Sequence, residues 1–395
     1  MLAAWYDRQG PAADVLHVGE LPNPEPGPGE VRVRISLSGI NPGDTKKRSG
    51  WQGTPMSFPR IIPHSDGAGV IDAVGDGVDG SRIGQRVWTY GAQSYRPFGT
   101  SAQLTCVPQR QAVPLTDEVS DEIGACLGIP GITAHRAVFS DGPVAGQTIL
   151  VHGVLGSVSS LAAQLAHWGG ATVIGTVVRS KDLDKVDTSV VSHPIALDSG
   201  DASAAVRRHA PDGVNRIVEV AFSDNADLDA AVVANDAVIA AYASRADRPE
   251  LPFWPMLFAN TTLRLLGSDD FSAEAKQQAG IDLTEAARVG ALRIAIAPPH
   301  PLAEIAAAHD HVDKGPRNGR VLVAIPGINL IRARTGATLF SAATWLMRQA
   351  ARCSPKNAKT RLHASSVAAR SYPKPAMRIS GWAGRVFAKL CPTPG

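Results

Sequence analysis

The stretch from Gln147 to Ala166 constrains the fold of this chain more than any other part of its sequence. It begins with an apolar, β-rich run over 148–152, which is typical of a strand buried on both faces. Small residues follow, and Leu161, Leu165 and Trp168 then recur at the spacing of one helix face. In a strand–turn–helix unit of this kind, backbone N–H groups and the helix N-terminus bind phosphate. The stretch therefore predicts a nucleotide-binding α/β fold.

The sequence around this unit also alternates between strand-like and helix-like segments from about residue 121. Such alternation predicts a Rossmann-type parallel sheet with helices on both faces. We expect strands at 148–152, 171–177, 215–220, 237–242 and 262–267, and helices at 157–168, 227–234 and 273–289. We also expect a helix over Leu302–His309 and a closing strand over Gly319–Ile325.

The first 125 residues have a different pattern. The proline-rich segment 22–30 cannot be helical, and it leads into an alternating run over 31–35. Further strand-like runs at 69–74 and 86–90 are separated by Gly and Asp turns. Short strands between such turns predict a small, barrel-like β domain.

Composition excludes several classes of protein. A length of 395 residues suffices for two domains with full cores, and 44% hydrophobic residues is ordinary for a globular protein. No apolar run approaches the ~20 residues of a membrane-spanning helix, and no signal peptide is visible at the N-terminus. The cysteines show no paired spacing, which argues against a disulfide framework and for a cytoplasmic location (Cys106, Cys126, Cys353 and Cys391).

The C-terminal tail, residues 327–395, differs in charge from the rest of the chain. It holds 12 Lys and Arg and no Asp or Glu, so residues 1–326 carry 27 basic and 36 acidic residues, a net charge of −9. We expect this basic tail to be disordered apart from a short helix over 339–351. A polycation can bind nucleic acid or anionic membrane without specificity, and the acidic body of the same chain is a third possible partner. A tail with no function of its own is the interpretation we favour.

Several motifs together resemble one protein family. They occur in the family order and are followed by Val151–Gly153: Pro26–Val31, Gly39–Thr45, Ser65–Val70, Ala73–Gly75, Gly84–Val87 and Gly128–Ala137. The chain over residues 1–326 is thereby similar to the zinc-independent quinone oxidoreductases (zeta-crystallin-like) of the medium-chain dehydrogenase/reductase superfamily.

The resemblance implies a GroES-like domain over residues 1–122 and a Rossmann NADP-binding domain over 123–268. It further implies that residues 269–326 complete the Rossmann domain and return to the first domain, and that the protein is a homodimer. The implied activity is NADPH-dependent reduction of quinones or related electrophilic carbonyl compounds. Reduction of an alkenal or enoyl double bond, and NADPH binding without catalysis, remain open as alternatives.

The positions that hold catalytic zinc in related dehydrogenases carry other residues here. Asn41 stands at the cysteine position, Ser65 stands at the histidine position, and His64 lies one residue early. Because zinc in such sites needs Cys and His ligands, we expect no metal. A quinone is already electrophilic, so a positioned hydride donor and hydrogen-bond donors for the developing oxyanion suffice.

The resemblance also implies roles for individual residues. The implied catalytic residues are Asn41, which would lie beside the nicotinamide and the substrate, and Thr133, which would offer its hydroxyl to the cofactor. Lys46 replaces a tyrosine common among relatives, within the basic segment 44–50. We interpret that segment as a solvated loop, with an entry funnel for anionic acceptors as the alternative.

The end of the second Rossmann strand predicts the cofactor. An NAD site usually places Asp or Glu there, whereas this chain has Val178 followed by Arg179, Ser180 and Lys181. Cations and a hydroxyl suit the 2′-phosphate of NADPH, which we therefore expect to be the cofactor.

The remaining contacts follow from position in the fold. The backbone of the turn should hold the pyrophosphate (Gly153, Leu155, Gly156, Ser157 and Val158), and three later residues should line the nicotinamide side (Tyr242, Ser244 and Phe271). Ser157 and Ser159 stand where relatives have glycine, and serine disfavours positive φ. The turn therefore either tolerates both serines or binds nucleotide more weakly. We interpret His152 as a core histidine, and Cys106 and Cys126 as small hydrophobic residues.

Overall fold

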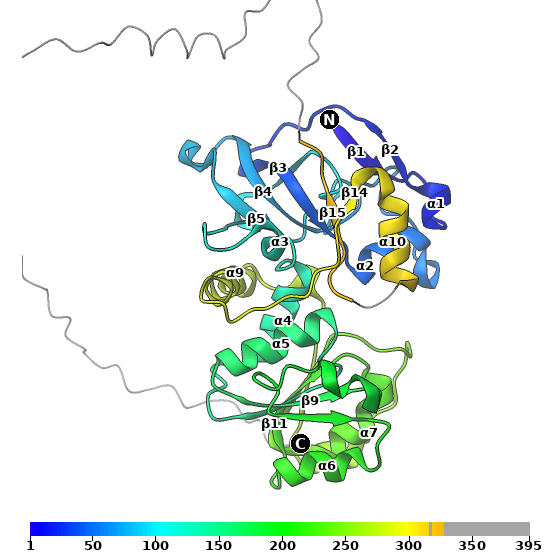
Figure 1. Cartoon of the computed structure of the whole chain (residues 1–395), viewed down its shortest axis with the longest axis vertical. Coiled ribbons are helices and arrows are strands. Elements are labelled where there is room, and N and C mark those ends of the chain that lie inside the picture. The colour runs from blue at the N-terminus through cyan, green and yellow to red at the C-terminus, as the bar shows by residue number, and fades with distance from the viewer. Residues whose placement is uncertain (316–317, 328–395) are drawn as a thin grey trace, which may run out of the picture. The chain divides into compact units, whose positions relative to one another are not determined.

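Two lobes, each built on a β-sheet, make up the part of the chain that this computed structural model describes, residues 1–315 and 318–327 (Figure 1). The predicted fold class, a β-rich domain followed by a parallel α/β domain, is confirmed. The predictions for the basic tail, including its helix over 339–351, fall outside the described residues. No helix in the described ranges combines the length and apolar character that crossing a membrane requires.

The first lobe contains a mostly antiparallel sheet centred on β3. Alternate residues of β3, among them Val31, Val33 and Ile35, are buried in one hydrophobic cluster, as the period of two in the sequence predicted. The sheet has the order β14 (His300–Pro301), β15 (Leu322–Ala324), β3 (Glu30–Gly39), β4 (Asp66–Val74), β5 (Arg86–Thr89) and β7 (Ala112–Pro114), and β6 (Leu104–Pro108) also pairs with β3. β1 (Leu2–Trp5) and β2 (His17–Glu20) form a separate two-stranded antiparallel sheet.

The basic segment predicted as a loop is instead helix α2 (Pro42–Ser49), so that interpretation was wrong. The backbone N–H of Asn41 donates to the Asp44 carboxylate at 2.7 Å, which caps the helix, and Gly50 ends it at a φ of 72°. Arg48 is buried rather than solvated, because its guanidinium pairs with Asp313 at 2.9 Å. The other helices of this lobe are α1 (Ala12–Val15), α3 (Asp121–Gly124) and α10 (Ile305–Lys314).

The second lobe contains six parallel strands. Their order is β10 (His193–Ala196), β9 (Thr172–Val177), β8 (Thr148–Val151), β11 (Val214–Glu219), β12 (Val233–Ala241) and β13 (Thr262–Leu265). The order reverses between β8 and β11, and in open α/β sheets ligands bind beyond the carboxyl ends of the strands at such a point.

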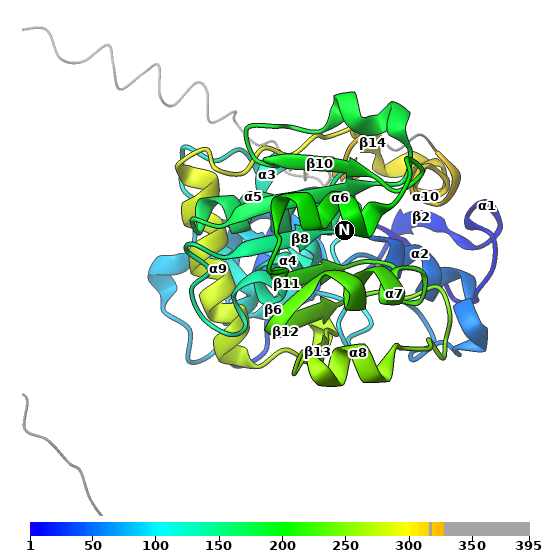
Figure 2. The ribbon, with the colours of Figure 1, turned by 90° about the horizontal axis from the view of Figure 1, so that it is seen from below.

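Both faces of this sheet are covered, as the apolar strand over 148–152 predicted. Ile149 and Val151 belong to the cluster with α4 (Ile129–Phe139), α5 (Ser157–Trp168) and α9 (Ala273–Arg288). Leu150 belongs to the opposite cluster with α6 (Ala202–His209), α7 (Phe222–Val232) and α8 (Phe253–Phe258). Figure 2 shows β13 and α8 together at one margin of this lobe.

Some predicted boundaries differ from the structure. Helix α7 begins at Phe222 instead of 227, directly after β11 and without a side-chain cap that would have marked its start. Strand β12 begins at Val233 instead of 237. The helix expected over 302–309 is a 3₁₀ turn over Leu302–Glu304 followed by α10. The other 3₁₀ helices are Trp51–Gly53, Gly80–Arg82, Gln109–Gln111, Ser180–Lys185 and Ser268–Asp270.

The chain returns to the first lobe after the second lobe is complete. Strand β15 pairs antiparallel with β3, with Leu322 opposite Gly39. Figure 1 shows β15 and α10, in orange and yellow, beside the blue strands of the first lobe. The first lobe is therefore built from both ends of the described chain.

Candidate functional site

The predicted phosphate-binding turn lies at the carboxyl end of β8, where the strand order reverses. Gly153 has a φ of 63°, and a Cβ there would lie 3.3 Å from the side chain of Val220. Gly156 precedes α5, and no side chain caps the first turn of that helix. Uncapped N–H groups at a helix start, reached through a glycine turn, fit a nucleotide pyrophosphate.

The two serines of the turn are accommodated without positive φ. Ser157 and Ser159 both lie within α5, and Gly153 alone supplies the left-handed conformation in this turn. The hydroxyl of Ser159 is buried and lies 2.8 Å from the hydroxyl of Tyr242. Ser159 therefore links α5 to the end of β12, a contact that the sequence did not reveal. Burial raises the pKa of Tyr242, so this phenol stays protonated.

His152 lies in a buried network beneath the turn. Its Nδ1 is 3.0 Å from the Thr176 hydroxyl, and its Nε2 is 3.0 Å from Asp229 and 3.6 Å from Glu219. Burial lowers the pKa of His152, but the hydrogen bond and the charges of the two carboxylates more than offset that effect. These contacts agree with the interpretation of His152 as a core histidine. The network ties the ends of β8, β9 and β11 to α7.

Asn41 and Asp66 form the polar centre of the first lobe at the start of α2. The Asn41 amide donates to Asp66 Oδ2 at 2.7 Å, and the Ile129 N–H donates to Asp66 Oδ1 at 2.8 Å. The guanidinium of Arg320 lies 3.7 Å from the same carboxylate. Burial raises the pKa of Asp66 to about 7, and Arg320 and the two hydrogen bonds only partly counter that rise.

The second predicted catalytic residue, Thr133, belongs to the same neighbourhood. It lies in the middle of α4 rather than at a helix start, and its hydroxyl donates to the Ile129 carbonyl at 2.7 Å. Ile129 thus contacts both Asp66 and Thr133. Asn41 and Thr133 are therefore connected through hydrogen bonds of Asp66 and Ile129.

The residues near the zinc-ligand positions make other contacts. His64 is buried, with its Nδ1 at 2.8 Å from Ser38 and 2.6 Å from Ser101 and its Nε2 at 3.0 Å from His309 Nε2. Cys106 and Cys126 are buried, and burial raises the pKa of their thiols to about 12 and about 11. Among the described residues, the compact group of possible metal ligands is His152, Glu219 and Asp229, which includes none of these side chains.

The predicted 2′-phosphate residues, 178–181, lie exposed after β9, and carboxylates contact two of them, Arg179 and Ser180. Arg179 Nε donates to Asp182 at 2.9 Å. The N–H and hydroxyl of Ser180 donate to Asp198 Oδ1 at 2.8 and 2.5 Å. The sequence did not reveal Asp198, because it lies 18 residues beyond Ser180 and outside the 178–181 segment. The parallel register of β10 and β9 is the signal that places Asp198 there.

Ser244, Phe271 and Lys46 were also predicted to contact the cofactor or the substrate, and the structure shows their local environment. The Ser244 hydroxyl donates to the Ala246 carbonyl at 2.8 Å, and Phe271 is half-buried between β13 and α9. Lys46 is exposed on α2, with its Nζ 4.4 Å from the centre of the Trp51 ring. These contacts do not test the roles that we predicted for them.

Contacts between the two lobes come mainly from residues for which the sequence predicted no role. The Tyr95 hydroxyl donates to the Asp270 carboxylate at 2.9 Å, and the Ser94 hydroxyl donates to Asp269 at 2.5 Å. Lys47 Nζ lies 3.9 Å from Asp269. The loop before β6 and the last turn of α2 thus bind the segment that follows β13.

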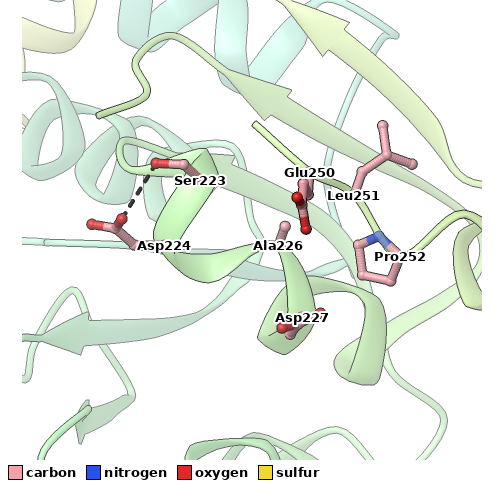
Figure 3. A pocket seen from close by; sticks show the side chains of 7 residues that line it. All are labelled: Ser223, Asp224, Ala226, Asp227, Glu250, Leu251 and Pro252. Atoms are coloured by element: carbon pink, nitrogen blue, oxygen red, sulfur yellow. Dashed lines mark hydrogen bonds between the residues drawn. The ribbon is translucent and has the colours of Figure 1, made fainter. Parts of the chain in front are cut away.

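A surface hollow of about 230 Å³ lies beside the start of α7 (Figure 3). Its lining contains three carboxylates, and Asp224 among them pairs with Arg245 at 3.0 Å. None of the residues predicted for the nucleotide or the acceptor lines it, and the full lining is Ser223, Asp224, Ala226, Asp227, Glu250, Leu251 and Pro252.

Comparisons with known proteins agree with this architecture. Residues 27–117 match the alcohol dehydrogenase GroES-like domain. A quinone oxidoreductase of Rattus norvegicus is 38% identical over 145 residues, which is 36% of this chain and 42% of that protein. A quinone oxidoreductase of Homo sapiens is 27% identical over 287 residues, 71% of this chain and 84% of that protein.

A mycobacterial protein whose structure was solved in complex with NADPH has the same fold. Its TM-score is 0.67 at 24% identity, covering 82% of this chain and 99% of that chain. The ordered motifs, the two-lobe fold and these relatives agree with one another. The chain belongs to the quinone oxidoreductase (zeta-crystallin-like) family of the medium-chain dehydrogenase/reductase superfamily.

Proposed function

We propose that this protein is an NADPH-dependent reductase of quinones or related electrophilic carbonyl compounds and that it acts without zinc. The observation that carries the proposal is the turn after β8, with Gly153 at positive φ and an uncapped α5 at the point of strand reversal. The names of the rat and human relatives support the reaction class.

The proposed nucleotide site uses residues of the turn after β8 and of the segment after β9. The backbone from Leu155 to Val158 would hold the pyrophosphate, and Arg179 and Lys181 would face the 2′-phosphate. Tyr242, Ser244 and Phe271 would border the nicotinamide. The NADPH complex of the mycobacterial neighbour supports this choice of cofactor. When bound, the reduced nicotinamide supplies the hydride.

Asn41 is suited to orient the acceptor. Its side-chain amide carries two hydrogens, and the hydrogen bond to Asp66 uses one of them. The second remains for a substrate oxygen, where a fixed donor stabilises developing negative charge. The Thr133 hydroxyl donates to Ile129, so its oxygen retains lone pairs that can accept a hydrogen bond from the cofactor.

The test is a fluorescence titration of the full chain with NADPH, followed by turnover assays against simple quinones, alkenals and enoyl compounds. Quinone turnover supports the proposal. Turnover of activated double bonds alone would replace it with the alkenal or enoyl reductase alternative. Tight NADPH binding without turnover of any acceptor would leave a non-catalytic nucleotide-binding protein.

We further propose that the protein acts as a homodimer joined through β13 and α8. β13 lies at the edge of the parallel sheet, where Leu265 is 73% exposed, and α8 beside it exposes Phe253, Trp254 and Phe258. An exposed apolar sheet edge of this kind promotes aggregation unless another surface covers it. A second copy covers it with a matching surface, because a two-fold axis pairs β13 with the β13 of the second copy.

We also propose a cytoplasmic location, which the free, buried thiols of Cys106 and Cys126 suit.

A further inference from the structure

Asp198 binds Ser180, which lies where the ribose of a bound nucleotide would contact this edge of the sheet. The backbone N–H and the hydroxyl of Ser180 both donate to Asp198 Oδ1, at 2.8 and 2.5 Å. Ser180 lies three residues beyond the end of β9, in the segment where an NAD-binding fold places its ribose-binding acid. A carboxylate is therefore present at the ribose edge, although none occurs within 178–181.

The sheet register fixes this placement. β10 runs parallel to β9, and Ala196 pairs with Val177 at their carboxyl ends. Asp198 follows Ala196 by two residues, so it emerges at the same edge of the sheet as Arg179 and Ser180. Asp198 is exposed, so its carboxylate is accessible to a ligand at this edge.

The neighbouring cation is held in the same way. Arg179 Nε donates to Asp182 Oδ2 at 2.9 Å, and Lys185 Nζ donates to the other oxygen of Asp182 at 2.7 Å. A 2′-phosphate would have to compete with carboxylates for both Arg179 and Ser180. A ribose 2′-hydroxyl meets no such competition, because it can donate a hydrogen bond to a carboxylate.

We propose that Asp198 is a specificity-determining residue that lowers the preference of the site for NADPH, so that NADH is accepted alongside it. This inference rests on the proposed function, since it assumes that a nicotinamide nucleotide binds beyond β8 and β9. The carboxylate of Asp198 receives the 2′-hydroxyl of NADH and repels the 2′-phosphate of NADPH.

The test is a fluorescence titration of the full chain with NADPH and, separately, with NADH. The wild type should bind the two nucleotides with dissociation constants within about tenfold of each other. Asp198→Asn keeps an oxygen that can accept the Ser180 hydrogen bonds but removes the charge. It should raise the ratio of NADPH to NADH affinity by about tenfold, and raised salt should shrink that gain.

Asp184→Asn is the matched control. Asp184 is an exposed carboxylate of the same 180–185 turn, but the carboxylate that Ser180 binds is that of Asp198. It should change the affinity ratio by less than about twofold. An unchanged ratio in Asp198→Asn, or a wild type that prefers NADPH by more than about a hundredfold, overturns the inference and leaves the reductase proposal standing. Failure of the wild type to bind either nucleotide overturns both.

Discussion

The Asn41 amide and the Asp66 carboxylate meet at 2.7 Å in a buried setting where Arg320 is the nearby cation. This contact fixes the amide that we propose to face the acceptor. The same carboxylate binds the first N–H of α4, so one side chain organises both predicted catalytic residues.

Asp66→Asn tests this arrangement. The amide nearly preserves the shape, but its NH₂ group replaces one of the two oxygens that accept from the Asn41 amide and the Ile129 N–H, so we expect a loss of at least about 1 kcal/mol in the free energy of unfolding. Urea denaturation at pH 6 measures it, because the raised pKa of Asp66, about 7, keeps its carboxyl mostly protonated there and the comparison is between two neutral side chains. Asp72→Asn, on the same strand, removes the partner of the more exposed Arg32 pair and should cost less than about 1 kcal/mol. Equal losses in both variants would contradict the prediction.

The buried pair of His64 and His309 predicts acid sensitivity. Burial lowers the pKa of His309 to about 3 and holds the pKa of His64 well below its ordinary value. The unfolded chain takes up protons on these imidazoles below about pH 6.5, whereas the folded chain does not. Stability contributed by the pair is therefore complete above pH 6.5 and is lost as the pH falls toward 3.

His309→Gln tests this by urea denaturation between pH 7 and pH 5. Loss of one titrating group should make the fall in stability with decreasing pH less steep, by up to about 1.4 kcal/mol per pH unit. The raised pKa values of Asp44 and Asp66 act in the opposite direction, but they are present in both proteins. His17→Gln, at an exposed histidine, should leave the slope unchanged. Parallel profiles for wild type and His309→Gln would refute the prediction.

The hydrogen bond between Ser159 and Tyr242 predicts an energetic coupling of about 1 kcal/mol. A double-mutant cycle of Ser159→Ala and Tyr242→Phe, followed by urea denaturation, measures it. Ser159→Gly should destabilise the fold but change NADPH affinity by less than about twofold, because the turn does not need positive φ at this position. An affinity gain of about tenfold would show instead that Ser159 weakens the nucleotide site.

The exposed edge strand predicts how the homodimer would be broken. Leu265→Glu places a charge at the proposed two-fold contact and should yield a monomer in sedimentation velocity. Ile83→Glu changes an equally apolar, 53% exposed side chain of the first lobe and should leave the dimer intact. A wild type that sediments as a monomer would remove the basis of the dimer proposal.

Local sequence patterns were sufficient for much of the fold. The apolar run before Gly153 predicted a strand buried on both faces, and the structure alternates Ile149, Leu150 and Val151 between two cores. Helix α2 was missed because its polar and basic residues lack an apolar period. Its formation depends on the Asn41–Asp44 cap and on Asp313 of α10, which pairs with Arg48 across a long separation in sequence.

The sequence predicted some residues of the candidate site and missed the contacts of others. The family motifs predicted Asn41 and Thr133 as site residues, and in the structure hydrogen bonds of Asp66 and Ile129 connect the two. Asp198 and Tyr242 acquire their partners, Ser180 and Ser159, from strand register and helix packing. Such pairings arise only once distant segments are folded against each other, so spacing along the chain does not report them.

The pairing of β15 with β3 bears on how this protein is made. Gly39 leaves the ribosome long before Leu322, yet the two lie opposite each other in one sheet. The 37–39 end of β3 therefore waits for its partner while the whole second lobe is synthesised. The second lobe is contiguous and can fold as soon as it emerges. In the nascent chain, the part made first is completed last, and during that interval an unpaired strand edge needs protection from other chains.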